Sequence, residues 1–65
     1  MKIYVNNQQL IVDENYTVEK LLEKHGIERS AAVWINGKQI LLKNYSSKQI
    51  QYGDEIKIIR IVGGG

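Results

Sequence analysis

The chain has 65 residues, enough for one compact domain but too few for two, and its 43% hydrophobic and 25% charged residues are a globular composition. Nine basic and seven acidic residues are mixed along the sequence and leave a net charge of +2, without the concentrated basic stripe that nucleic-acid binding requires. Because cysteine is absent, disulfides, thiolate metal sites and a cysteine nucleophile are excluded.

The N-terminal segment is predicted to form a hairpin. Residues 2–6 alternate in polarity, with Ile3 and Val5 on one face, which is the period of a half-buried strand. The polar residues 6–9 have the character of a turn, and residues 10–12 are a second extended, apolar run. The two runs are therefore expected to pair as antiparallel strands.

A short helix is predicted next. The Thr17 hydroxyl can accept a hydrogen bond from an amide of the first helical turn, which makes this residue the expected N-cap. Val18, Leu21 and Leu22 have i, i+3, i+4 spacing and form one apolar stripe. Because Gly26 suits the left-handed position after a helix, the helix is expected to span about two turns.

The remaining strands are indicated by turn signals. Residues 31–35 and 38–42 are expected to form a hairpin around the Asn-Gly dipeptide at 36–37, because both residue types tolerate positive φ. Residues 43–51 are a polar connection with room for a short helical turn, and residues 55–62 form the last strand. The C-terminal half is therefore predicted to supply three strands.

Strands and helix in this order predict an α+β fold. The helix lies between the two hairpins and can serve as a right-handed crossover that packs across a mixed five-stranded sheet. This is the β-grasp architecture. The predicted domain spans residues 1–62, and residues 63–65 are expected to form a flexible glycine tail.

The segments that carry a family resemblance are spread along the chain. They are Lys2-Ile3-Tyr4-Val5-Asn6, Thr17-Val18-x-x-Leu21-Leu22, Ile35-Asn36-Gly37, Gly53-Asp54-x-Ile56 and the final Gly63-Gly64-Gly65. In combination they resemble ThiS, the ubiquitin-like sulfur carrier family of thiamine biosynthesis, over the whole chain.

The resemblance implies a function for the glycine tail. Gly64 and Gly65 match the terminal pair of the family, and Gly63 is an additional glycine. By resemblance, a ubiquitin-activating-like adenylyltransferase uses ATP to adenylate the Gly65 carboxylate, which is then converted into a thiocarboxylate with sulfur from a donating enzyme. A thiazole synthase receives that sulfur. The chain itself is expected to be a carrier that binds no cofactor, and not an enzyme.

The residues are compatible with this division of labour. The chain has no phosphate-cradling P-loop and no nucleophile elbow, so activation of a carboxylate has to come from a partner. Glycines lack Cβ atoms and can enter a narrow channel, and three of them extend by roughly 10 Å.

Strand alternation predicts a second functional region. If the alternate apolar residues face the helix, then Tyr4, Trp34, Lys57 and Ile59 face away from it. Exposed apolar side chains with a basic rim, here including Arg60, often mark an interface. We interpret these five residues as a partner-binding patch, with the alternative that Trp34 only covers the small core.

Other polar residues are not expected to form a site. Asp13, Glu14 and Asp54 occupy turn-like places without clustered ligand partners, so no metal site is predicted. His25 is expected in the last helical turn, in a structural role. Three tyrosines are expected to anchor loops: Tyr16, Tyr45 and Tyr52. Without a membrane-length apolar run or a signal peptide, a cytoplasmic location and no membrane partner are expected.

Three alternatives to a thiamine sulfur carrier stay open. A MoaD-like carrier for molybdopterin synthesis would use the same tail chemistry. A ubiquitin-like modifier would instead be joined to lysines through Gly65, and isopeptide adducts would identify it. A β-grasp module that binds nucleic acid or a regulatory partner would keep its binding after removal of Gly64 and Gly65.

Overall fold

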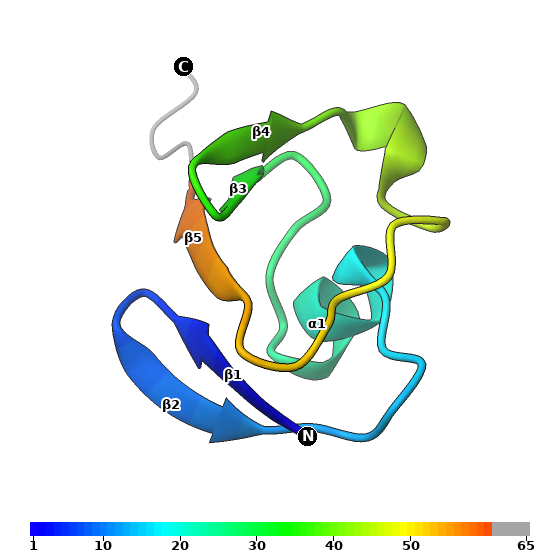
Figure 1. The fold of residues 1–65 in the computed structure, drawn as a ribbon. Coiled ribbons are helices and arrows are strands. Elements are labelled where there is room, and N and C mark those ends of the chain that lie inside the picture. Colours follow the sequence, from blue (N-terminus) through cyan, green and yellow to red (C-terminus); the bar gives the residue numbers. More distant parts are fainter. Residues whose placement is uncertain (61–65) are drawn as a thin grey trace.

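The computed structural model describes residues 1–60, which form a mixed five-stranded sheet and one α-helix (Figure 1). The elements in chain order are β1 (Lys2–Val5), β2 (Gln8–Ile11), α1 (Val18–Lys24), β3 (Ala32–Ile35), β4 (Lys38–Ile40), the 3₁₀ turn η1 (Leu42–Asn44) and β5 (Glu55–Ile59). The strand order is β2-β1-β5-β3-β4, with β1 and β5 parallel and the other neighbours antiparallel. The predicted β-grasp fold is therefore confirmed.

The first hairpin is tighter than predicted. Its turn consists of Asn6 and Asn7 alone, with φ values of 49° and 70°, and Gln8 already pairs with Val5. Two successive residues with positive φ are the requirement of a type I′ turn, which matches the twist of the flanking strands. The prediction of a turn over residues 6–9 was wrong, because the asparagines need no further residues to reverse the chain.

The helix has the predicted start and end. The Thr17 hydroxyl accepts a 3.1 Å hydrogen bond from the Lys20 amide and is the N-cap. Gly26 follows the helix with a φ of 65°, and the Ile27 amide donates a 2.8 Å hydrogen bond back to the Leu22 carbonyl oxygen. This closing pattern is a Schellman motif, which satisfies carbonyl groups that the helix leaves unpaired.

The fourth strand is shorter than the predicted residues 38–42. It ends at Ile40, and the next two residues, Leu41 and Leu42, are 55% and 53% exposed. Leu42 begins η1, so the helical turn expected in the connection is confirmed but starts before residue 43. These two leucines look like strand residues in the sequence, yet the chain leaves the edge of the sheet before it reaches them.

The central strand β5 ends at Ile59 rather than at residue 62. Arg60 lies beyond it and is exposed, and residues 61–62 lie outside the described part of the chain. Because β5 pairs with β1 on one side and β3 on the other, it leads out of the middle of the sheet.

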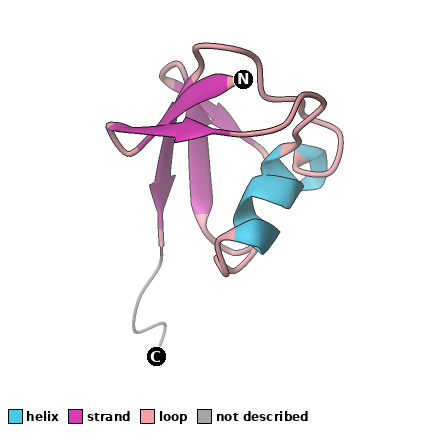
Figure 2. Ribbon diagram, turned by 90° about the horizontal axis from the view of Figure 1, so that it is seen from below, coloured by secondary structure: helices cyan, strands magenta, loops and turns pink. Residues whose placement is uncertain are grey.

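The core lies between the sheet and α1, which covers one face (Figure 2). Its buried residues come from all elements except β2, β4 and η1: Ile3, Val12, Tyr16, Val18, Leu21, Leu22, Ala31, Val33, Ile35, Tyr45, Ile50, Ile56 and Ile58. The predicted apolar stripe of the helix is thus buried against alternate residues of the three central strands. Among residues 1–60, no helix is long and apolar enough to cross a membrane.

Candidate functional site

The face of the sheet opposite α1 gathers the predicted partner-binding residues. Strand register pairs Tyr4 with Glu55, Trp34 with Lys57 and Ala32 with Ile59. Directly paired residues project from the same face of a sheet, whereas their neighbours along each strand project from the other. The neighbours Ile3, Val33 and Ile58 are buried, so the open face is the one that carries Tyr4, Trp34, Lys57 and Ile59.

This face is hollowed into an open depression of about 860 Å³, which we call the open-face groove. The groove is lined by Tyr4, Asn6, Asn7, Trp34, Asn36, Gly37, Glu55, Ile56, Lys57 and Ile59. Both aromatic side chains are half-buried, and Ile59 is 49% exposed. Trp34 therefore presents part of its ring to solvent and is not a member of the core beneath the helix.

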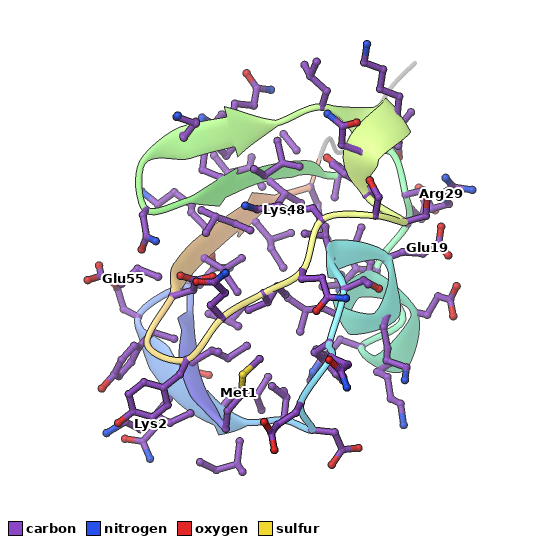
Figure 3. The ribbon with its side chains drawn as sticks, turned by 45° about the vertical axis from the view of Figure 1, so that its right-hand side comes forward. Met1, Lys2, Glu19, Arg29, Lys48 and Glu55 are labelled. Atoms are coloured by element: carbon purple, nitrogen blue, oxygen red, sulfur yellow. The ribbon has the colours of Figure 1, made fainter. Side chains whose placement is uncertain are left out.

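Basic side chains lie within the groove and beside it. The Lys2 ammonium lies 5.9 Å from the centroid of the Tyr4 ring, the spacing of a cation–π contact. Lys57 projects from the middle of the face, and the exposed Arg60 follows the end of β5. Glu55 supplies the carboxylate among the lining residues, and Figure 3 shows Lys2 and Glu55 both directed away from the helix.

Asparagines of the two hairpin turns hold β5 from opposite sides. On the β3 side, the Asn36 carboxamide accepts a 3.0 Å hydrogen bond from the Glu55 amide and donates a 3.0 Å hydrogen bond to the Asp54 carboxylate. On the β1 side, the Asn6 carboxamide accepts a 2.8 Å hydrogen bond from the Ile58 amide and donates a 3.2 Å hydrogen bond to the Ile58 carbonyl oxygen. Sequence reasoning treated both residues only as turn formers, and their carboxamides, which can donate and accept at once, were the missed signal.

The N-terminal end of α1 is closed by the chain itself. The Val18 amide donates to the Lys48 carbonyl oxygen at 3.1 Å, and the Glu19 amide donates to that of Tyr45 at 3.0 Å. With Lys20 bonded to Thr17, these first helical amides are occupied and do not offer a phosphate site.

Neither the acidic residues nor the histidine form a site within residues 1–60. No three His, Asp or Glu side chains in that range are grouped for a metal ion. Asp54 instead joins the hydrogen-bonded turn beside Asn36 and accepts the Gln51 amide at 2.8 Å. His25 is the exposed C-cap residue of α1. Glu19 forms an ion pair with Arg29 at 3.6 Å (Figure 3).

Two of the three predicted tyrosine anchors are confirmed. Tyr16 and Tyr45 are buried, and burial raises the pKa of each phenol above its ordinary value. The nearby Asp13 carboxylate raises the pKa of Tyr16 further. Tyr52 is 70% exposed and anchors nothing, so that prediction was wrong; the Gly53 turn holds it at the surface.

The residues of the predicted tail, Gly63, Gly64 and Gly65, lie outside the described part of the chain. The described structure ends at Arg60, one residue after β5. Ile59 both lines the open-face groove and ends β5, so the groove extends to the last strand residue of the described chain.

Comparison with known proteins agrees with this architecture. The model of the ThiS family matches residues 1–65. The crystal structure of the thiamine biosynthesis protein ThiS from Geobacter metallireducens superposes with a TM-score of 0.83 at 25% identity and covers 100% of both chains. The solution structure of a thiamine biosynthesis protein from that organism superposes with a TM-score of 0.80 at 25% identity, and the match covers 100% of this chain and 88% of the other. A search of curated proteins finds no match. The chain belongs to the ThiS family, the small sulfur carriers of thiamine biosynthesis.

Proposed function

We propose that this chain carries sulfur as a thiocarboxylate on Gly65 and delivers it to thiazole formation. The observation that carries the proposal is the family match over residues 1–65, which includes the glycine end that follows the central strand β5. Gly63 and Gly64 would give that end a backbone without Cβ atoms, able to enter a narrow channel in conformations that other residues avoid.

The chemistry requires two steps, because a carboxylate is a poor electrophile. In the first, a Gly65 carboxylate oxygen attacks the α-phosphorus of ATP and pyrophosphate leaves, which produces an acyl adenylate. In the second, a sulfur nucleophile at the oxidation level of sulfide attacks the acyl carbon and AMP leaves. The product is the thiocarboxylate, whose sulfur is the nucleophile offered to the thiazole synthase.

The proposal assigns the ATP site to a partner, a ubiquitin-activating-like adenylyltransferase. Support comes from the N-terminal end of α1, whose amides are bonded to Lys48, Tyr45 and Thr17 and are not directed to a nucleotide. The carrier contributes the reacting carboxylate and a surface that docks, while the partner supplies the phosphate-binding and catalytic groups.

The open-face groove is the proposed docking surface for that adenylyltransferase. It combines two aromatic side chains and an exposed isoleucine with basic side chains within and beside the groove, and aromatic and basic residues are typical of protein interfaces. Its position beside β5 matters as well. Ile59 precedes Gly65 by six residues, a span of at most about 20 Å, so a partner bound at the groove can still reach the carboxylate.

Intact-mass spectrometry tests the proposal directly. The chain is incubated with ATP, candidate adenylyltransferases and sulfide, beside a reaction without ATP and a variant that lacks Gly64 and Gly65. We expect an ATP-dependent mass increase equal to the exchange of one oxygen for sulfur, located at Gly65 in fragment spectra and absent from the truncated variant. An unchanged mass with enzymes that load other carriers would contradict the proposal, and isopeptide adducts on lysines would assign the chain to protein modification.

A further inference from the structure

The pairing of β5 is uneven along its two sides. On the β3 side, register pairs continue to Ile59, which lies opposite Ala32. On the β1 side, they stop at Ile56, which lies opposite Val5, because the chain turns away at Asn6. The last part of β5 would therefore be an unpaired edge on one side, although this strand lies in the middle of the sheet.

The side chain of Asn6 occupies the place of the missing strand. Its main-chain amide donates to the Ile56 carbonyl oxygen at 2.9 Å and ends the regular ladder. Its carboxamide then accepts the Ile58 amide at 2.8 Å and donates to the Ile58 carbonyl oxygen at 3.2 Å. One donor and one acceptor on the same carboxamide supply the hydrogen-bonding groups that a strand residue would offer. The effective pairing of β5 on this side is thereby extended by two residues, or roughly 7 Å of extended chain.

We propose that Asn6 is a positioning residue, which fixes the direction in which the chain leaves the sheet at Arg60 and so aligns the carboxylate end for adenylation. The inference rests on the proposed function. Without the carboxamide, the β1 side of β5 is held only to Ile56, and the point at which the chain can bend moves back into the strand. Pairing with β3 still holds Lys57 and Ile59 in the groove, so docking is kept, while the reacting end that follows Arg60 loses its fixed direction relative to the docked partner.

Asparagine is the residue that this position requires. The turn holds Asn6 at a φ of 49°, a conformation in which asparagine and aspartate are enriched among residues with a side chain. Aspartate offers acceptors but no donor for the Ile58 carbonyl oxygen, and glycine offers neither group. Glycine keeps the backbone conformation at no steric cost, so Asn6→Gly removes the two hydrogen bonds and leaves the turn possible.

The chain contains two matched controls. Asn7 has a φ of 70° in the same turn and lines the same groove, but within residues 1–60 its side chain makes no hydrogen bond. Asn36 has a φ of 51° and binds β5 through its carboxamide, but at Glu55, the end of the strand far from the tail. All three asparagines line the groove, so both variants control for the loss of a groove contact. In addition, Asn7→Gly controls for turn flexibility, and Asn36→Gly controls for loss of stability.

The experiment compares Asn6→Gly, Asn7→Gly and Asn36→Gly in two measurements. In the free chain, amide hydrogen exchange and ¹⁵N relaxation of residues 58–60 are recorded by NMR. We expect Asn6→Gly alone to lose about tenfold of the exchange protection at Ile58, the factor that corresponds to one ordinary hydrogen bond, and to lose order at Arg60. The adenylation assay uses the enzyme that loads the wild-type chain. With Asn6→Gly as the substrate, we expect kcat to fall by about tenfold or more, with a much smaller change in KM.

Each outcome has a definite meaning. Equal amide exchange at residues 58–60 in Asn6→Gly and Asn7→Gly would overturn the inference. The inference would also be overturned if the kcat of an equally destabilised Asn36→Gly fell as far as that of Asn6→Gly. If Asn6→Gly does not fold, Asn6→Asp keeps one of the two hydrogen bonds and is compared with Asn7→Asp under the same criteria. If no enzyme loads the wild-type chain, the proposed function fails, while exchange in the free chain still decides whether Asn6 fixes the end of β5.

Discussion

The hydroxyl of Tyr45 donates a 2.7 Å hydrogen bond to the main-chain carbonyl oxygen of Ala31, and both residues are 3% exposed. The Tyr45 carbonyl oxygen also accepts the Glu19 amide from the first turn of α1. Tyr45 thus ties the long connection before β5 to the segment that enters β3 through its side chain, and to the helix through its main chain. The side-chain contact joins the connection to Ala31, two segments that no strand pairing connects.

Tyr45→Phe is predicted to lower the free energy of unfolding by about 1 to 3 kcal/mol, because it leaves the buried Ala31 carbonyl oxygen without its donor. Urea unfolding followed by circular dichroism measures the change. Tyr52→Phe is the control, since Tyr52 is 70% exposed, and its effect is expected to stay below about 0.5 kcal/mol. A Tyr45→Phe variant as stable as the control would show that water replaces the donor.

Alkaline pH is predicted to destabilise the fold through Tyr16 and Tyr45. Burial raises the pKa of both phenols in the folded state, so above about pH 10 the unfolded chain releases these protons first. The unfolded state then binds fewer protons, and the free energy of unfolding falls as pH rises until the raised folded-state pKa values are passed. Chemical denaturation between pH 8 and pH 12 (about two units either side of 10) measures the slope.

The control for this pH dependence is the Tyr16→Phe/Tyr45→Phe double variant, in which neither buried position can titrate. Its loss of stability between neutral and alkaline pH is expected to be smaller than that of the wild-type chain, although it starts from a lower free energy of unfolding. Identical slopes would mean that other groups, not these tyrosines, produce the alkaline transition.

Thr17→Ala is predicted to cost about 1 kcal/mol of stability, because the Lys20 amide loses the acceptor that caps the helix. Thr17→Ser retains a hydroxyl at the same place and is expected to stay close to the wild-type value. Thermal unfolding of the three proteins side by side provides the measurement. Equal losses for alanine and serine would indicate that the methyl group of Thr17, not its hydroxyl, stabilises the helix start.

The helix and the faces of the sheet could be predicted because their signals are local. Thr17 and Gly26 mark the helix ends within ten positions of each other, and alternation within a single strand separates core residues from open-face residues. The ends of β2 and β4 could not be read this way. At those ends the identity of the last strand residue depends on turn geometry and on where the partner strand stops.

The support of β5 by turn asparagines could not be predicted from the sequence alone. Asn6 and Ile58 are separated by 52 positions, and their contact exists only because the strand order places β1 beside β5. The same dependence explains Tyr52, whose exposure follows from a turn in which Gly53 donates a 2.7 Å hydrogen bond to the Lys2 carbonyl oxygen. Sequence patterns identify the faces of elements, but side chains that bridge elements require the assembled sheet.

Trp34→Ala is predicted to weaken binding to the adenylyltransferase by at least about tenfold, because large aromatic side chains at the centre of an interface contribute most to affinity. Since Trp34 is only half-buried, its loss of stability should stay well below the roughly 3 to 5 kcal/mol of a core tryptophan. Ile11→Ala is the control, because Ile11 is 68% exposed on the same sheet but outside the groove. Calorimetry gives affinity, and unfolding curves give stability. Normal affinity in a strongly destabilised Trp34→Ala would assign the residue to the core.

Lys57→Glu is predicted to slow association with the adenylyltransferase several-fold at low ionic strength, because the charge of an exposed lysine on the docking face steers the approach of the partner. The difference from the wild-type chain should shrink as salt is added, since exposed charges are screened over about 10 Å at 0.1 M salt. Stopped-flow measurements over a salt series determine both effects. Lys38→Glu makes the same change in net charge at an exposed residue of the edge strand β4, outside the groove. If the two variants slow association equally, overall charge accounts for the result and Lys57 is not at the contact; if only Lys57→Glu is slow, the partner approaches the open face.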